Sequence, residues 1–181
     1  SGGCNVVSGY YAAFALSTGK RNVFFGTRAG MGVSTGCNNI AIGEETLGGT
    51  YHYSNSGNEN VAIGGCANTI KLTTGTRNIH LGSRAGMCAS TGSYNFFAGY
   101  YSGGNAVVTG SNNVAIGCNA GKKISSGADN IALGRLAMGS DAVTGNYNIA
   151  FGFEAGCGIN SGTGNVLLGQ CAGRALENGG C

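Results

Sequence analysis

Cysteine offers the most chemistry in this chain of 181 residues, because its eight thiols could form disulfides, bind metals or act as nucleophiles. No two cysteines form a C-x-x-C pair, the spacing typical of zinc sites and of thioredoxin-type redox centres. So many cysteines in a short chain favour an oxidising, extracellular compartment, where disulfides persist. The sequence therefore predicts thiols that cross-link chains rather than a metal centre, with buried, unreacted thiols as the alternative for some of them.

Groups for acid–base catalysis are sparse. His52 and His80 have no third ligand at metal spacing, and His80 is expected at an outward position of a strand. The carboxylates form no pair spaced for a general acid and a general base. They include Glu44, Glu45, Asp129 and Asp141. No serine stands in the context of a nucleophile elbow. We expect a protein that is not an enzyme and that needs no cofactor.

An internal repeat supplies the elements that must position these groups. Ten asparagines are each followed four residues later by a glycine, and they are 17, 17, 21, 18, 17, 18, 17, 18 and 17 residues apart. A fixed period of this length indicates one structural unit stacked on itself. The asparagine ladder consists of Asn5, Asn22, Asn39, Asn60, Asn78, Asn95, Asn113, Asn130, Asn148 and Asn165.

Each repeat predicts a short strand followed by turns. Apolar residues alternate after the asparagine, as in Val23 and Phe25, and such pairs are expected to face the core. The apolar position three residues before the next repeat's first glycine, such as Val33 or Val107, is also expected inside. The chain has 37 glycines, which disfavour helix. The prediction is an all-β fold: a β-solenoid of about ten 17–18-residue coils, forming a single repeat domain over residues 1–181 with an insertion at about 48–59.

The asparagines themselves are interpreted as structural. An asparagine side chain bonds backbone groups at a corner and tolerates unusual φ angles. Stacked in every coil, its amide could also bond the amides above and below, which would satisfy buried polar groups. The alternative, a row of amides that binds a ligand, would require them to be exposed.

The first and last cysteines occupy equivalent places in the repeat. Cys4 directly precedes Asn5, and Cys181 lies 16 residues after Asn165, where the next asparagine would follow in a 17-residue coil. If two copies stacked head to tail, these Cα atoms would lie ~4.8 Å apart, the spacing of neighbouring strands. That separation suits a disulfide. The sequence thus suggests an open filament with interchain disulfides, against the alternative of free terminal thiols.

Recognition, if any, would use the outward positions. The insertion carries Tyr51, His52 and Tyr53, which form a possible contact loop for carbohydrate or protein. A serine or threonine precedes the first glycine of nearly every repeat, as Thr18 and Thr35 do, and could carry sugars or serve in turns. The expected partners are copies of the chain itself and, for a binding function, surface glycans.

Charge and hydropathy argue against two other partners. The net charge is only +3, and the basic residues are scattered, which disfavours a nucleic-acid partner. No run of 18 apolar residues is present, so the sequence predicts no membrane span.

The runs Gly110–Gly121 and Gly145–Gly156 resemble repeats of phage tail-fibre-like and bacterial surface proteins, many of which carry an endosialidase-type self-cleaving chaperone. Trimeric autotransporter adhesin heads are more distantly similar. The resemblance covers nearly the whole chain and implies a fibre used for adhesion, located outside the cell, at the cell surface or on a virion. Two functions are therefore expected: a structural subunit of an extracellular filament or, alternatively, a tail-fibre or adhesin shaft that binds a glycan or receptor.

Overall fold

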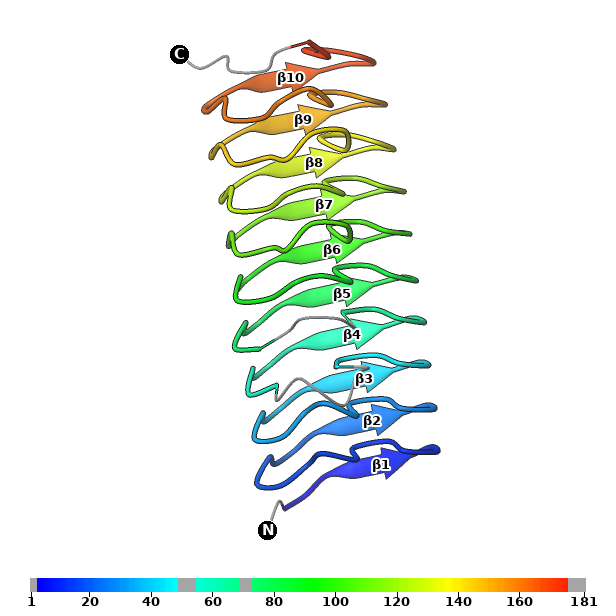
Figure 1. Cartoon of the computed structure of the whole chain (residues 1–181). Coiled ribbons are helices and arrows are strands. Elements are labelled where there is room, and N and C mark those ends of the chain that lie inside the picture. Colours follow the sequence, from blue (N-terminus) through cyan, green and yellow to red (C-terminus); the bar gives the residue numbers. More distant parts are fainter. Residues whose placement is uncertain (1–2, 49–54, 69–72, 176–181) are drawn as a thin grey trace.

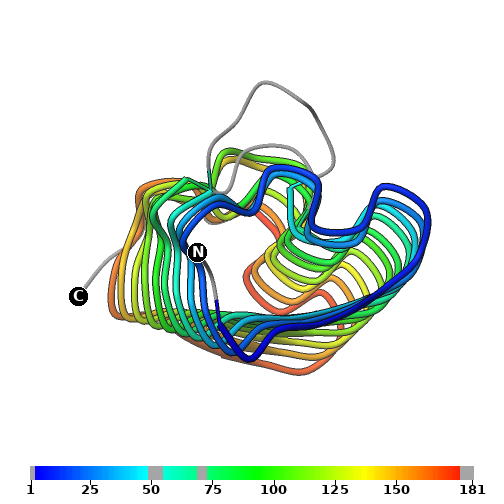
Figure 2. The same cartoon turned by 90° about the horizontal axis from the view of Figure 1, so that it is seen from below.

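The computed structural model describes residues 3–48, 55–68 and 73–175, and it contains ten short strands and no helix within these ranges. The strands pair in parallel and in chain order, forming one ten-stranded sheet (Figure 1). Each coil adds one strand, and the coils superpose when viewed along the axis (Figure 2). This arrangement confirms the predicted β-solenoid. The strands are β1 (Val6–Ser8), β2 (Val23–Phe25), β3 (Ile40–Ile42), β4 (Val61–Ile63), β5 (Ile79–Leu81), β6 (Phe96–Ala98), β7 (Val114–Ile116), β8 (Ile131–Leu133), β9 (Ile149–Phe151) and β10 (Val166–Leu168).

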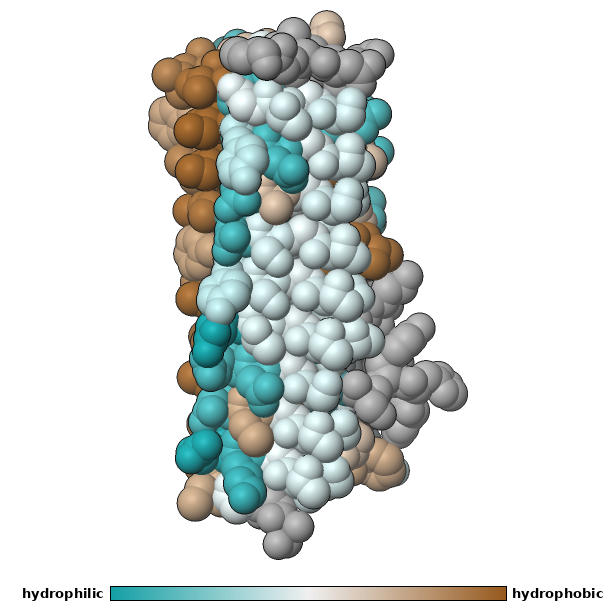
Figure 3. All heavy atoms as spheres, turned by 90° about the vertical axis from the view of Figure 1, so that its left-hand side faces the viewer, coloured by the Kyte–Doolittle hydropathy of each residue, from teal (hydrophilic) through white to brown (hydrophobic). Residues whose placement is uncertain are grey.

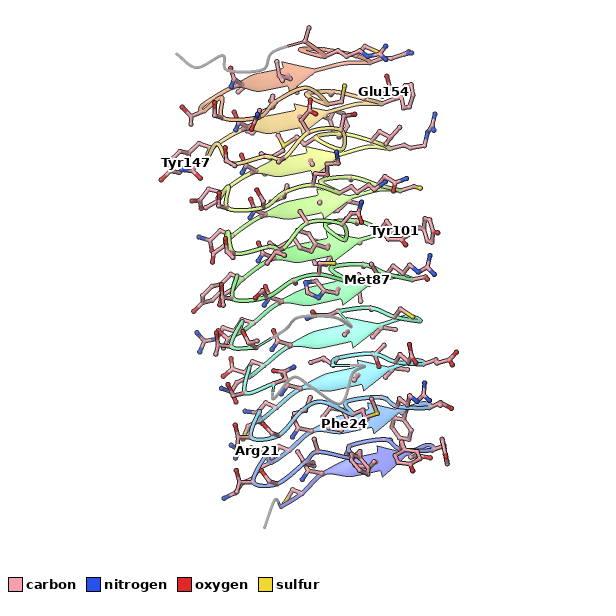
Figure 4. All side chains as sticks on the ribbon, viewed as in Figure 1. Arg21, Phe24, Met87, Tyr101, Tyr147 and Glu154 are labelled. Atoms are coloured by element: carbon pink, nitrogen blue, oxygen red, sulfur yellow. The ribbon has the colours of Figure 1, made fainter. Side chains whose placement is uncertain are left out.

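Sharp corners bound each strand. The residue before the asparagine adopts a positive φ, as in Arg21 (56°) and Tyr147 (60°), and both lie at one corner of the coil (Figure 4). The glycine that follows the strand closes the other side: Gly117 has a φ of 129°. A Cβ on Gly117 would lie 2.8 Å from the carbonyl carbon of Gly134 in the next coil. Glycine recurs at this position because both the conformation and the close approach exclude a side chain.

The middle residue of each strand faces the core, and the apolar residues on either side of it face outward. In β2, Phe24 is fully buried, whereas Val23 is half-buried and Phe25 is exposed. In β7, Ala115 is buried between half-buried Val114 and exposed Ile116. The expectation that the flanking apolar pair faces the core was therefore wrong. Side chains alternate along a strand, and the buried asparagine sets the inward phase at its own position and two residues later.

In the core, the middle residue of a strand and the residue six positions later compensate for each other in size. Phe97 is accommodated by Gly103, where a Cβ would lie 2.4 Å from the Phe97 ring. At the equivalent positions of β8 and the turn after it, Ala132 is paired with Met138. In these two coils, a large side chain in the strand thus goes with glycine six residues later, and alanine goes with methionine there. Ala115 and Ala150 are instead followed by Gly121 and Gly156, beside which Ile124 and Ile159 fill the space. These pairings keep the interior filled, as close packing requires.

This compensation predicts coupled substitutions. Gly103→Met alone should destabilise the chain through overlap with Phe97, and Phe97→Ala alone should leave a cavity. The double variant recreates the Ala132–Met138 arrangement, so we expect a favourable coupling energy of about 1–3 kcal/mol. Urea unfolding of the four proteins of the cycle measures this quantity. Additive effects of the two substitutions would contradict the compensation.

One further inward position was misplaced by a single residue. Val33, Ile124 and Ile159 are buried as expected, but Val107 is exposed and Val108 is buried instead. Val108 lies in an 18-residue coil and forms a parallel bridge with Ala89 of the preceding 17-residue coil. The extra residue shifts the inward phase, which a rule counted back from the next glycine does not capture.

Candidate functional site

The asparagine ladder forms a continuous column of hydrogen bonds inside the corner of the solenoid. From Asn22 to Asn165, each backbone N–H donates to Oδ1 of the preceding ladder asparagine at 2.8–3.1 Å. Each Nδ2 donates to the same Oδ1 at 2.9–3.2 Å. From Asn5 to Asn148, Nδ2 also donates to the carbonyl of the first glycine of the next repeat, at 2.8–3.0 Å.

These bonds assign the ladder to the architecture of the coil. The members from Asn22 to Asn148 are at most 1% exposed, so their amides are not presented to a ligand. Each amide satisfies a backbone N–H and a backbone carbonyl that the tight corner would otherwise leave unpaired in the interior. Residues that contact a ligand or a partner must therefore lie elsewhere on the coil.

His80 lies inside the core, so its expected outward position was wrong. It occupies the middle of β5, is fully buried, and stacks on Phe97 with ring centroids 5.3 Å apart. Neither imidazole nitrogen has a hydrogen-bond partner among the described residues. Burial lowers the pKa of His80 to about 3, because the charged form would lose its hydration. The side chain therefore serves as a neutral core residue at ordinary pH.

Of the two terminal cysteines, Cys4 is exposed and precedes Asn5 in the positive-φ corner, with a φ of 59°. Cys181 lies outside the described residues. Among the other described cysteines, Cys118 is exposed and Cys157 is buried. Two others recur beside a glutamate of the preceding coil: Cys66 Sγ lies 3.9 Å from Glu45 Oε2, and Cys171 Sγ lies 3.8 Å from Glu154 Oε2. Burial, followed by the charge of Glu45, raises the pKa of the Cys66 thiol, which keeps it in the less reactive protonated form.

The possible contact loop Tyr51, His52 and Tyr53 also lies outside the described residues. A second aromatic group lies at the corner opposite Arg21, where Tyr101 is visible in Figure 4. Tyr100 and Tyr101 pack edge to face at 4.8 Å. The guanidinium of Arg84 lies 5.1 Å from the Tyr101 ring centroid and donates to the Tyr101 hydroxyl at 3.0 Å. This corner combines cationic and aromatic surface, but its contacts are already made within the chain.

The hydroxyl positions form an exposed stripe. Thr18, Thr35, Thr91 and Thr109 are exposed, and Ser56 is half-buried. Ser56 Oγ donates to the carbonyl of Thr73 in the next coil at 3.1 Å. The side of the rod that faces the viewer in Figure 3 is mostly pale, so its residues are neither strongly hydrophilic nor strongly hydrophobic.

The sequence interpretation missed the outer face of the sheet. Because the middle residue of each strand points inward, its two neighbours form two columns on the outside, and these columns are almost wholly apolar. We call the first and third residues of β1 to β10 the apolar sheet face. Ile116 is 40% exposed and Phe151 is 56% exposed. The phase of the buried asparagine could have revealed this face from the sequence.

No pocket and no cluster of potential metal ligands occurs within the described residues. The same part of the chain has no helix with the length and apolar character needed to cross a membrane. Comparisons with models of protein families, with curated proteins and with solved structures found no match. Function must therefore be argued from the coil ends and the outer surfaces.

Proposed function

We propose that the chain is a non-enzymatic structural protein, a rigid subunit of an extracellular filament or fibre built by end-to-end stacking of β-solenoids. The supporting observation is that the first coil exposes side chains whose counterparts in the second coil belong to the core. Val7 in β1 is 42% exposed, whereas Phe24, its neighbour in the same inward column, is completely buried. Phe14 of the first coil is also exposed, while Met31 at the equivalent place in the second coil is buried. Another coil of the same cross-section would cover these side chains.

The backbone supports the same contact. Ten strands at a spacing of ~4.8 Å give a rod roughly 45 Å long, whose first and last strands each have one unpaired edge in the described chain. Open edges template further strands. The asparagine ladder and the corner glycines would continue across such a junction in register. A disulfide between Cys4 and Cys181 of stacked copies would then lock the junction covalently.

Negative-stain electron microscopy and paired gels test this proposal. We expect thin filaments, and a ladder of multimers on a non-reducing gel that collapses to monomer with reductant. Cys4→Ser should abolish the covalent ladder. Val7→Glu should shorten or abolish the filaments, because it places a charge on the end face. Val107→Glu is the matched control, since Val107 is also 42% exposed but does not belong to the inward column.

Two kinds of result would overturn end-to-end stacking. A chain that stays monomeric, or a discrete trimer with free thiols at Cys4 and Cys181, would exclude end-to-end stacking. Equal effects of Val7→Glu and Val107→Glu would show that the end face is not the contact. Either result would favour the adhesin or tail-fibre shaft, for which exposed Tyr100 beside Arg84 is the best-placed contact residue.

A further inference from the structure

The apolar sheet face is unusual for a surface. Its two columns run without interruption over all ten strands, every residue in them except Ser8 is apolar, and none is charged. The apolar side chains gather in a stripe along one edge of the molecule, from end to end (Figure 3). Several of the most exposed large apolar residues belong to this face, among them Phe25, Phe151 and Leu168.

This face is as large as the apolar patches that are often functional. Nine strand spacings give a length of about 43 Å, and two side-chain columns give a width of about 12 Å, for a projected area on the order of 500 Å². The largest apolar patch on a typical monomer is about 300–600 Å² and is often functional. Single exposed apolar residues need no explanation, but a continuous and charge-free strip of this size indicates a covered surface.

A second copy of the chain fits this strip best. The columns repeat with the spacing of the strands, so the ridges of one copy match the grooves of another at the same pitch along the whole rod. Facing sheets with interdigitated side chains pack about 10 Å apart and exclude water. Two such faces would together bury about 1,000 Å², which reaches the lower limit for a specific interface. Because this face carries no charged residue, it offers no group that would attract a polar partner or a nucleic acid.

We propose that two copies pair through their apolar sheet faces, each face covering the other. A pair of this kind is isologous, so each residue of the face contributes twice to the interface. Pairing does not require end-to-end stacking. Where stacking also occurs, the strip continues from subunit to subunit, and many weak contacts act together along the paired filaments.

The test uses sedimentation velocity of the full chain in reductant, so that disulfides do not contribute. We expect a dimer at tens of micromolar for the wild type. Ile116→Lys, at the centre of the strip, should raise the dissociation constant at least 100-fold, because both copies would carry the buried charge. Val107→Lys is the control: Val107 has nearly the same exposure as Ile116 but lies outside the face. Circular dichroism establishes that each variant is folded.

Microscopy separates this proposal from end-to-end stacking. Loss of lateral pairing should halve the filament width in Ile116→Lys at unchanged length, whereas Val7→Glu should change the length and leave the width. A wild-type monomer at all concentrations, or equal behaviour of Ile116→Lys and Val107→Lys, would overturn the pairing. A monomer that floats with phosphatidylcholine vesicles would assign the face to lipid instead, and a trimer sensitive to Ile116→Lys would replace the pair with a threefold contact.

Discussion

Replacing Asn113 by alanine should lower the free energy of unfolding by about 3–5 kcal/mol, because two buried backbone groups would lose their partners. The Asn113 side chain donates to the carbonyl of Gly127 at 2.9 Å and accepts the backbone N–H of Asn130 at 3.0 Å. It also bonds the amides of Asn95 and Asn130. Alanine supplies none of these bonds, and the fully buried corner admits no solvent to replace them.

Urea unfolding measures the loss, and hydrogen exchange at the amide of Asn130 locates it. That amide should become much less protected in Asn113→Ala, while amides of the distant coils change little, since a solenoid coil contacts mainly its neighbours. Asn105→Ala is the matched control: it makes the same chemical change at an exposed asparagine outside the ladder. A loss below 1 kcal/mol, or equal losses in the two variants, would show that the ladder does not stabilise the fold.

The chain should lose stability as the pH falls from 6.5 towards 3, through His80. In the folded state the pKa of His80 is lowered to about 3 by burial, so the native protein leaves this ring neutral. The unfolded chain binds a proton there below about pH 6.5. Stability from this group is therefore complete above pH 6.5 and decreases as the pH falls, by up to roughly 5 kcal/mol over the whole interval.

His80→Phe isolates this effect from the carboxylates, which titrate identically in both proteins. Phenylalanine already occupies the same column at Phe24 and Phe97, and Gly86 leaves the space for a ring as Gly30 and Gly103 do there. The stability advantage of His80→Phe over the wild type should grow by about 1.4 kcal/mol per pH unit between pH 6 and pH 4. Urea unfolding at pH 7.5, 6, 5 and 4 provides the comparison. A constant difference would contradict the buried, neutral histidine.

The repeat was the part of the fold that the sequence alone could predict. Asparagine and glycine recur at fixed spacing because the corner geometry allows few other residues: Gly117 must tolerate a φ of 129° close to the next coil. Constraints of that kind appear directly as residue identity. The period then determines the number of coils, and the short alternating segments determine the strands.

The sequence prediction was wrong about which residues of each strand point into the core. The position of the asparagine would have given the correct phase. Asn22 and Phe24 lie two residues apart in one extended segment, so a buried asparagine requires a buried Phe24 and outward neighbours. Hydrophobicity pointed the other way, because Val23 and Phe25 are as apolar as core residues. His80 was misplaced by the same error of phase. As a result, the candidate site shifted from the loop and the cysteines to the sheet face.

The core pairs could not be read from a single coil. Alanine at position 132 is uninformative until Met138 is seen to fill the space beside it, and Phe97 needs Gly103. Such complementarity depends on side chains that approach one another across the coil. Only the three-dimensional arrangement shows which turn residue faces which strand residue.

The asparagine ladder gives the rod a polarity along its axis. Every Oδ1 from Asn5 to Asn148 accepts hydrogen bonds from the following coil, so all these side-chain carbonyl oxygens point along the axis towards the C-terminal end. Within the ladder, the Oδ1 acceptors therefore face the C-terminal end of the rod, and the backbone N–H groups that they bind face the N-terminal end. Across a junction, these donors meet these acceptors only when the two rods join with the same orientation. A filament of rods stacked in this way is polar, and its two growing ends are chemically distinct.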